Sequence, residues 1–322
     1  MSGIRKIIIL VFGIVFLLLE SIYLIGVFTR NPVEVTEDVE VLPGDNITDF
    51  VPPFVPLLND YAVVAGYNLL GCNIRKSMSQ LNYNLLCYLN NTKLYVERNQ
   101  SLSDLWYNKR TSCKKISFNT YEPLIRKGKR RMEDLTKFAF IRNPEERFVS
   151  FFVDKCLKAK FCGNCTDVRC AVKMIYDRLM PLAHNHSLFI KTNEKWWFEW
   201  HSAPQTWNCD FYKYISDFHL IPIGTSLEDR QIAMKKLQKV LRFAKVEDEY
   251  IEKIIRDTLE SDTKHATHNS DLSQQVLEQV QTDPYVRHYL HRIYYFDYIA
   301  FGMKLPEFFN GQDFPKEYIP RS

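Results

Sequence analysis

Arg142 and Ser150 are the residues whose types and spacing point most directly to chemistry. An apolar, β-prone run over 138–141 ends at Arg142, and Asn143-Pro144 then stops the strand and opens a helix with two glutamates in its first turn. We expect Arg142 at the carboxyl end of a buried strand, where open α/β sheets bind ligands, with Ser150 two helical turns further on. A guanidinium beside a hydroxyl suits a phosphate monoester. The plainer alternative is an arginine that caps a buried helix start.

A second candidate anion site is the loop Arg75-Lys76-Ser77-Met78-Ser79. It lies between a buried strand predicted over 61–70 and a helix predicted over 77–89 from the spacing of its apolar residues. Backbone N–H groups at the helix start, one lysine and two hydroxyls would hold a phosphate or sulfate. The alternative is an ordinary amphipathic helix with a basic first turn, which opposes the helix dipole. The loop lacks the second glycine of the ATPase loop, so a Walker-type nucleoside triphosphatase is disfavoured.

Length and composition suit one large domain with a substantial core. The chain has 322 residues, 46% of them hydrophobic, and a net charge of +4. This mild charge fits an acidic ligand bound locally and argues against a protein that coats nucleic acid. The sequence does not indicate an oligomeric state.

The amino-terminal region predicts a membrane anchor. Arg5-Lys6 precede an apolar run over 7–28, long enough for one bilayer crossing, and the basic flank predicts a cytosolic tail of residues 1–6. A cleaved signal peptide is the alternative, but no good cleavage site follows. The proline-rich residues 29–58 are predicted to form a luminal stem, and residues 59–322 the folded domain.

Sequons and cysteines agree with a luminal domain. Asn-x-Ser/Thr sequons predict glycosylation at Asn46, Asn90, Asn99, Asn164 and Asn185. All eight cysteines follow the anchor. In that compartment we expect Cys156, Cys162, Cys165 and Cys170 to form disulfides; zinc or redox chemistry would be the alternative in the cytosol.

The elements that must position these motifs alternate between strand and helix. After the two strands above, a third is predicted over 218–224, followed by helices over 227–244, 247–260, 272–281 and 284–300. This alternation favours an α/β domain with a central parallel sheet covered by helices on both faces.

Taken together, these motifs resemble those of the Golgi carbohydrate sulfotransferases of the chondroitin type, particularly their nematode-like branch. Cys72–Ser79 resembles the family's loop for the 5′-phosphosulfate of 3′-phosphoadenosine 5′-phosphosulfate (PAPS). Arg142–Ser150 resembles its Arg-Asp-Pro-x-x-Arg-Phe-x-Ser loop for the 3′-phosphate, with Asn143 replacing the commoner aspartate. The resemblance covers 60–303 and includes the segments 154–156, 201–209 and 294–302.

The resemblance implies a P-loop-like sulfotransferase fold and a PAPS-dependent transfer to a glycan, glycosaminoglycan-like or glycoprotein-linked. Lys76 would stabilise the leaving phosphate. The donor's 5′ end would lie on the loop that contains Arg75, Ser77, Met78 and Ser79, and its 3′-phosphate on Arg142 and Ser150. No metal is required.

The resemblance also indicates a catalytic base and a compartment. His201 is the preferred base for the acceptor hydroxyl, with His265 and Glu146 in reserve. The enzyme would be a type II protein of the Golgi membrane with a luminal catalytic domain.

Two other functions fit the same anchor and stem. A Golgi glycosyltransferase would usually hold a divalent metal with an Asp-x-Asp element, which occurs nowhere in this chain. A non-catalytic ectodomain of the same fold would not need Lys76, Arg142 and Ser150, and it would not bind adenosine 3′,5′-bisphosphate, the nucleotide product.

Overall fold

The computed structural model describes residues 47–57, 59–105, 116–118, 132–185, 197–260 and 270–306. The predicted anchor over 7–28, most of the predicted stem, Asn46 and His265 lie outside these residues. Within the described part of the chain, we find no helix with the length and apolar content needed to span a bilayer.

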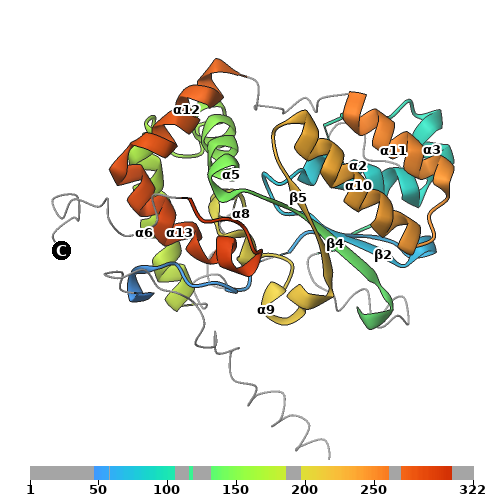
Figure 1. Cartoon of the computed structure of the whole chain (residues 1–322), viewed down its shortest axis with the longest axis horizontal. Helices are drawn as coiled ribbons and strands as arrows, with labels where there is room; N and C mark the ends of the chain where they lie inside the picture. Colours follow the sequence, from blue (N-terminus) through green and yellow to red (C-terminus); the bar gives the residue numbers. More distant parts are fainter. Residues whose placement is uncertain are drawn as a thin grey trace, which may run out of the picture. The chain divides into compact units, whose positions relative to one another are not determined.

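A mixed sheet forms the centre of the fold (Figure 1). In the described residues it has five strands in the order β3-β1-β2-β4-β5. Their bounds are β1 Tyr61–Val64, β2 Leu69–Cys72, β3 Ser117–Phe118, β4 Thr136–Arg142 and β5 Phe218–Ile223. Strands β2, β4 and β5 are parallel, so their carboxyl ends meet at one edge, whereas β1 runs antiparallel to both β2 and β3. The predicted parallel sheet is therefore confirmed for its central strands only.

The single strand predicted over 61–70 is wrong. A 3-10 turn, η2 (Ala65–Tyr67), interrupts it, and Asn68 takes a left-handed conformation with φ 49°. The chain therefore reverses and forms two antiparallel strands, β1 and β2. The apolar residues on both sides of the turn are buried, which is why the stretch resembles one continuous strand in the sequence.

Helices cover one face of the sheet. Helices α2 (Ser79–Asn90), α10 (Leu227–Phe243) and α11 (Asp248–Glu260) share a core with alternate residues of β1, β4 and β5, as Figure 1 shows. The short α3 (Thr92–Glu97) contributes Tyr95 to this core. The opposite face is covered by the short α9 (Phe211–Tyr214), with Phe211 and Cys209 against β4. The predicted helices that begin near 77, 227 and 247 are confirmed.

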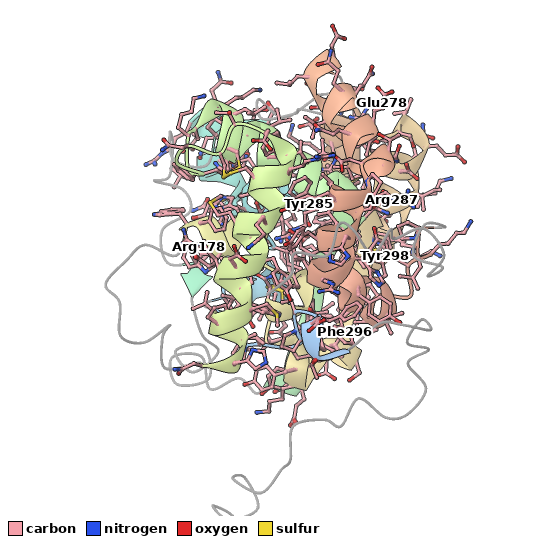
Figure 2. All side chains as sticks on the ribbon, turned by 90° about the vertical axis from the view of Figure 1, so that its left-hand side faces the viewer. Arg178, Glu278, Tyr285, Arg287, Phe296 and Tyr298 are labelled. Carbon is pink, nitrogen blue, oxygen red and sulfur yellow. A yellow bond between two sulfur atoms is a disulfide. The ribbon has the colours of Figure 1, made fainter. Side chains whose placement is uncertain are left out.

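A second group of helices surrounds its own core beyond the carboxyl edge of the sheet. It contains α5 (Pro144–Phe151), which continues as the π-helix η5 (Phe152–Lys158), with α6 (Val168–His184), α8 (Trp197–Ser202), α12 (Asp271–Thr282) and α13 (Pro284–Ala300). Figure 2 shows α6, with Arg178, beside α13, with Tyr285 and Tyr298. The helices predicted over 272–281 and 284–300 are confirmed.

Part of the predicted stem belongs to the folded body. Phe50, Val51 and Leu57 are buried, and the Trp207 Nε1 donates a hydrogen bond of 2.7 Å to the Pro52 carbonyl oxygen. The prolines of this stretch exclude a regular helix or strand, but the apolar residues between them still reach the core. The folded body therefore begins before residue 59.

The cysteines of the described region are oxidised. Cys156 pairs with Cys162, Cys165 with Cys170, and Cys72 with Cys209 across 137 positions of sequence. Cys87 is also disulfide-bonded, to a partner outside the described residues. These pairs confirm the disulfide interpretation. Four sequon asparagines are exposed, as glycosylation requires, namely Asn90, Asn99, Asn164 and Asn185.

Candidate functional site

The connection from β2 to α2 has an open, basic helix start. Lys76 and Met78 both adopt left-handed conformations, with φ of 66° and 55°, on either side of Ser77. Met78 occupies the N-cap position of α2 without a capping side-chain hydrogen bond, and the first turn of α2 contains no acidic residue. The amides at this helix start therefore lack the usual side-chain partner, and they form the kind of concavity that binds anions.

Lys76 supplies a largely buried positive charge next to this helix start. Its side chain is 9% exposed, and its Nζ lies 2.7 Å from Asp154 Oδ2. Burial lowers the pKa of Lys76 to about 8, even though the charge of Asp154 favours the protonated form. Burial alone would raise the pKa of Asp154, but the charges and hydrogen bonds of Lys76 and Lys155 lower it to about 2. Lys76 and Asp154 thus form an ion pair at neutral pH.

Arg142 joins the two loops. It is the last residue of β4; its Nη1 donates a hydrogen bond of 3.4 Å to the Lys76 carbonyl, and its Nε donates one of 3.2 Å to Glu146. Burial lowers the pKa of Arg142, which Glu146 partly offsets, and the guanidinium stays charged because its ordinary pKa is so high. Two candidate phosphate ligands from distant parts of the sequence therefore lie side by side.

Gln205 holds this arrangement together. Its Oε1 accepts hydrogen bonds of 2.9 Å from the Arg142 backbone N–H and from the Ser77 hydroxyl, and its Nε2 donates one of 2.7 Å to the Arg142 carbonyl. Asp297, fully buried on α13, accepts the Gln205 and Thr206 backbone N–H groups at 2.8 and 2.9 Å. One amide side chain thus fixes both anion loops.

Arg147 has a structural role, although it belongs to the same motif as Arg142. Its side chain is buried, and it donates hydrogen bonds to the carbonyl oxygens of Arg75, Ala203 and His201. The guanidinium thereby joins the β2–α2 loop to the segment after α8.

His201 lies in the last turn of α8 in the form that a catalytic base needs. Its Nδ1–H donates to the Trp197 carbonyl oxygen. Burial, assisted by the nearby charges of Arg75, Lys155 and Lys76, lowers the pKa of His201 well below its ordinary value. The neutral imidazole therefore leaves Nε2 as an acceptor that can receive a proton, but the lowered pKa also makes His201 a weaker base than a free imidazole.

The other predicted site residues are placed less directly. Ser150 is buried within α5, and among the described residues no hydrogen bond joins it to Arg142. Arg75 is paired with Asp60 at 2.8 Å, and Met78 packs its side chain against the core under the sheet. Ser79 is the first residue of α2 and partly buried.

Glu146, a reserve candidate for the base, is held by Arg142, and such an ion pair weakens a carboxylate as a base. The described residues include no group of His, Cys, Asp or Glu side chains that could hold a metal ion.

Sequence reasoning did not assign three residues that the structure places in the site: Gln205, Asp154 and Asp297. All three lie in segments that resemble family motifs, and that was their only signal. An amide that bridges two loops leaves no periodic or compositional trace in a sequence.

Aromatic and basic side chains border the site on the side of His201. Trp197 and Phe161 are 36% and 46% exposed, and the Lys155 Nζ lies 5.4 Å from the centre of the Phe161 ring. The Arg75 guanidinium lies 5.7 Å from the ring of Trp200, which packs against Trp197. Exposed aromatic faces beside cations suit a polar ligand with apolar faces, as sugars have.

Comparisons with known proteins agree with this geometry. Residues 59–304 match the sulfotransferase family. The chain is 30% identical over 285 residues to "Carbohydrate sulfotransferase chst-1" of Caenorhabditis elegans, a match that spans 85% of this chain and 83% of the relative. It is 25% identical over 218 residues to "Putative sulfotransferase vep-2" of the same organism, across 62% of this chain and 63% of that protein. No solved structure matches the chain significantly.

Proposed function

The chain belongs to the sulfotransferase family, and from this premise we propose that it transfers the sulfuryl group of PAPS to a hydroxyl group of a glycan. The observation that carries the proposal is the uncapped, basic start of α2, with Lys76 beside it and Arg142 hydrogen-bonded to its loop. A donor with phosphate groups at both its 5′ and 3′ ends needs two neighbouring anion sites of this kind.

The donor fits the described residues. The amides at the start of α2 would hold the 5′-phosphosulfate, and Lys76 would lie near the oxygen that bridges sulfur and phosphorus. The Ser77 hydroxyl would assist only if it gave up its hydrogen bond to Gln205. Arg142 would pair with the 3′-phosphate through its fork of N–H groups. Ser150 would assist only if its hydroxyl turned toward that phosphate.

The chemistry follows from these positions. The acceptor oxygen attacks sulfur in line while the bond from sulfur to the bridging oxygen breaks, and the bridging oxygen leaves with the nucleotide phosphate. As in phosphoryl transfer, positioning and charge stabilisation dominate. Lys76 would neutralise the charge that develops on the leaving phosphate. His201 Nε2 would take the proton of the acceptor hydroxyl.

The acceptor would occupy the border formed by Trp197, Trp200 and Phe161. A carbohydrate acceptor is suggested by the name of the nematode relative and by two exposed rings, Trp197 beside His201 and Phe161 beside Lys155. A glycosaminoglycan-like chain would bring anionic groups toward Lys155 and Arg75.

The compartment is part of the proposal. The predicted anchor over 7–28 would place the domain in the Golgi lumen as a type II membrane protein. The disulfides and the exposed sequon asparagines support an oxidising, glycosylating compartment.

The test is transfer of labelled sulfate from PAPS to a panel of glycans, with the full chain expressed in membranes. We expect Lys76→Ala to lower the rate by about 100- to 1000-fold, the usual effect of removing one group that stabilises transition-state charge. Lys173→Ala is the matched control, because Lys173 pairs with Asp177 on α6, away from the site, and its loss should leave the rate unchanged. A folded wild-type protein that neither binds adenosine 3′,5′-bisphosphate nor transfers sulfate would overturn the proposal and favour the non-catalytic ectodomain.

A further inference from the structure

Asp154 is an acidic residue in a site built for anions. It lies on η5, where its Oδ2 is 2.7 Å from Lys76 Nζ and 3.1 Å from Lys155 Nζ, and its side chain is 14% exposed. Its carboxylate is paired with the ammonium group that an anionic donor would use. A carboxylate in this position opposes donor binding, so its presence needs a compensating role.

The surroundings of Lys76 show what that role is. The ammonium faces two other cations, Lys155 on η5 and Arg142 at the end of β4, and both favour the neutral amine, as burial does. His201 on α8 lies near enough for the charges of Lys76 and Lys155 to lower its pKa, so its imidazole is neutral and adds no charge beside Lys76. Asp154 is the anion that opposes all of these effects on Lys76. A neutral lysine would hold no phosphate charge and would stabilise no leaving group.

We propose that Asp154 is a positioning residue that keeps Lys76 charged and in place while the donor site is empty, and that releases it to the donor on binding. This inference rests on the proposed function for its catalytic consequence, but the charge state of Lys76 can be measured without turnover. Once the donor is bound, its phosphosulfate supplies the negative charge that Asp154 supplies in the empty site. The need for Asp154 is therefore confined to the free protein.

If Asp154 is needed only in the free protein, its loss should affect one pH profile and not the other. The pH dependence of kcat/KM for PAPS reports the free enzyme, whereas that of kcat reports the enzyme with substrate bound. In the wild type, kcat/KM should fall above pH about 8, the pKa of Lys76. In Asp154→Asn, the pH above which kcat/KM falls should be lower by about 1–3 units, because one close opposite charge usually shifts a pKa by this amount. The alkaline side of the kcat profile should not move. Asp154→Glu should restore the wild-type profile of kcat/KM.

A direct measurement separates this inference from the proposed function. The rate at which an amine-reactive reagent modifies Lys76, followed by mass spectrometry across pH without donor, gives the pKa of that lysine. The midpoint should lie near pH 8 in the wild type, lower in Asp154→Asn, and higher in Lys155→Ala, where a neighbouring cation is lost. Lys173 serves as the internal control, because it lies on α6 and pairs with Asp177 and not with Asp154.

The outcomes are distinct. An unchanged midpoint for Lys76 in a folded Asp154→Asn protein overturns the inference, whatever the enzyme transfers. A wild type that binds no donor while the midpoints shift as expected removes the proposed function and leaves the role of Asp154 toward Lys76 intact. Should Asp154→Asn fail to fold, as judged by circular dichroism and thermal unfolding, Asp154→Ser provides the same neutral substitution with less bulk.

Discussion

The two strand-to-helix connections at the carboxyl edge of the sheet differ in how the backbone N–H groups at the helix start are capped. At the start of α5, the Asn143 side chain accepts the backbone N–H groups of Glu145 and Glu146 at 2.9 and 3.3 Å, and the first turn contains both glutamates. At the start of α2 there is no capping side chain, no acidic residue and two left-handed residues. The first helix start is capped by a side chain of its own, whereas the second has no capping side chain.

Under the proposed function, this difference would give the two phosphate ends of the donor different kinds of protein ligand. The amides of α5 are already satisfied, so an anion at that connection must bind to the Arg142 side chain. The start of α2 has no capping side chain, so an anion there could bind to the backbone with Lys76 beside it. In the proposed donor site, one loop would therefore recognise charge through a side chain and the other through main-chain geometry.

The largest expected effect on binding comes from Arg142. If the β4–α5 connection binds a phosphate only through the Arg142 side chain, Arg142→Ala should weaken the binding of adenosine 3′,5′-bisphosphate by about 10- to 100-fold. This is the range for loss of a charged hydrogen-bonding group. Arg142→Lys should recover only part of this, because an ammonium cannot form the bidentate contact. Isothermal titration measures both variants. Equal affinities for Arg142→Ala and the wild type would mean that this connection binds no phosphate.

A smaller effect is expected when α2 is given the acidic first turn that α5 already has. Ser79→Asp places a carboxylate at the first position of α2. It should stabilise the ligand-free protein by about 0.3–1 kcal/mol through the helix dipole and weaken adenosine 3′,5′-bisphosphate binding by up to about tenfold. Chemical denaturation and titration give the two values. A gain in stability without a loss of affinity would show that the ligand does not use this helix start.

The smallest effect on binding, and the clearest on stability, should come from the cap of α5. Asn143→Ala should lower the free energy of unfolding by about 1 kcal/mol, as loss of an N-cap usually does, and change ligand affinity little. Asn91→Ala is the matched control, because Asn91 caps the exposed α3 through a hydrogen bond of 3.0 Å from the Leu94 N–H. The comparison between the two connections would fail if Asn143→Ala weakened binding as strongly as Arg142→Ala.

Local sequence signals predicted most of the helical architecture. Asn143-Pro144 marked the start of α5 because the side chain and the ring both act within the same turn. Helices α10 to α13 were visible from their apolar spacing because each buries one stripe of side chains. The same signals could not separate β1 from β2, since the residues on both sides of the turn are equally apolar and buried.

The site was predictable where a residue type carries chemistry by itself, and it was hidden where a residue acts by supporting another one, as Gln205, Asp154 and Asp297 do. Lys76, Arg142 and His201 could be named because their residue types carry chemistry at any position. Gln205 could not, because its importance depends on a contact with Ser77 that spans 128 positions of sequence. The buried apolar residues of 50–57 (Phe50, Val51, Val55 and Leu57) were hidden for a related reason. The prolines between them resemble those of an exposed linker, and the stretch is held by Trp207 and α13.

The disulfide between Cys72 and Cys209 has a consequence for the order in which this molecule can be assembled and dismantled. Its two cysteines lie just before the Lys76 loop and just after the Gln205 segment, so the bond closes a covalent ring that contains β4, α5, η5, α6 and α8. In the chain-entropy account, closing a ring of this size removes about 5 kcal/mol of freedom from the unfolded chain. An unfolded but oxidised chain therefore keeps the two halves of the site tethered, and refolding begins from that tether. In a reduced chain the segments around Cys72 and Cys209 are not linked, and they must meet by diffusion before the site can form.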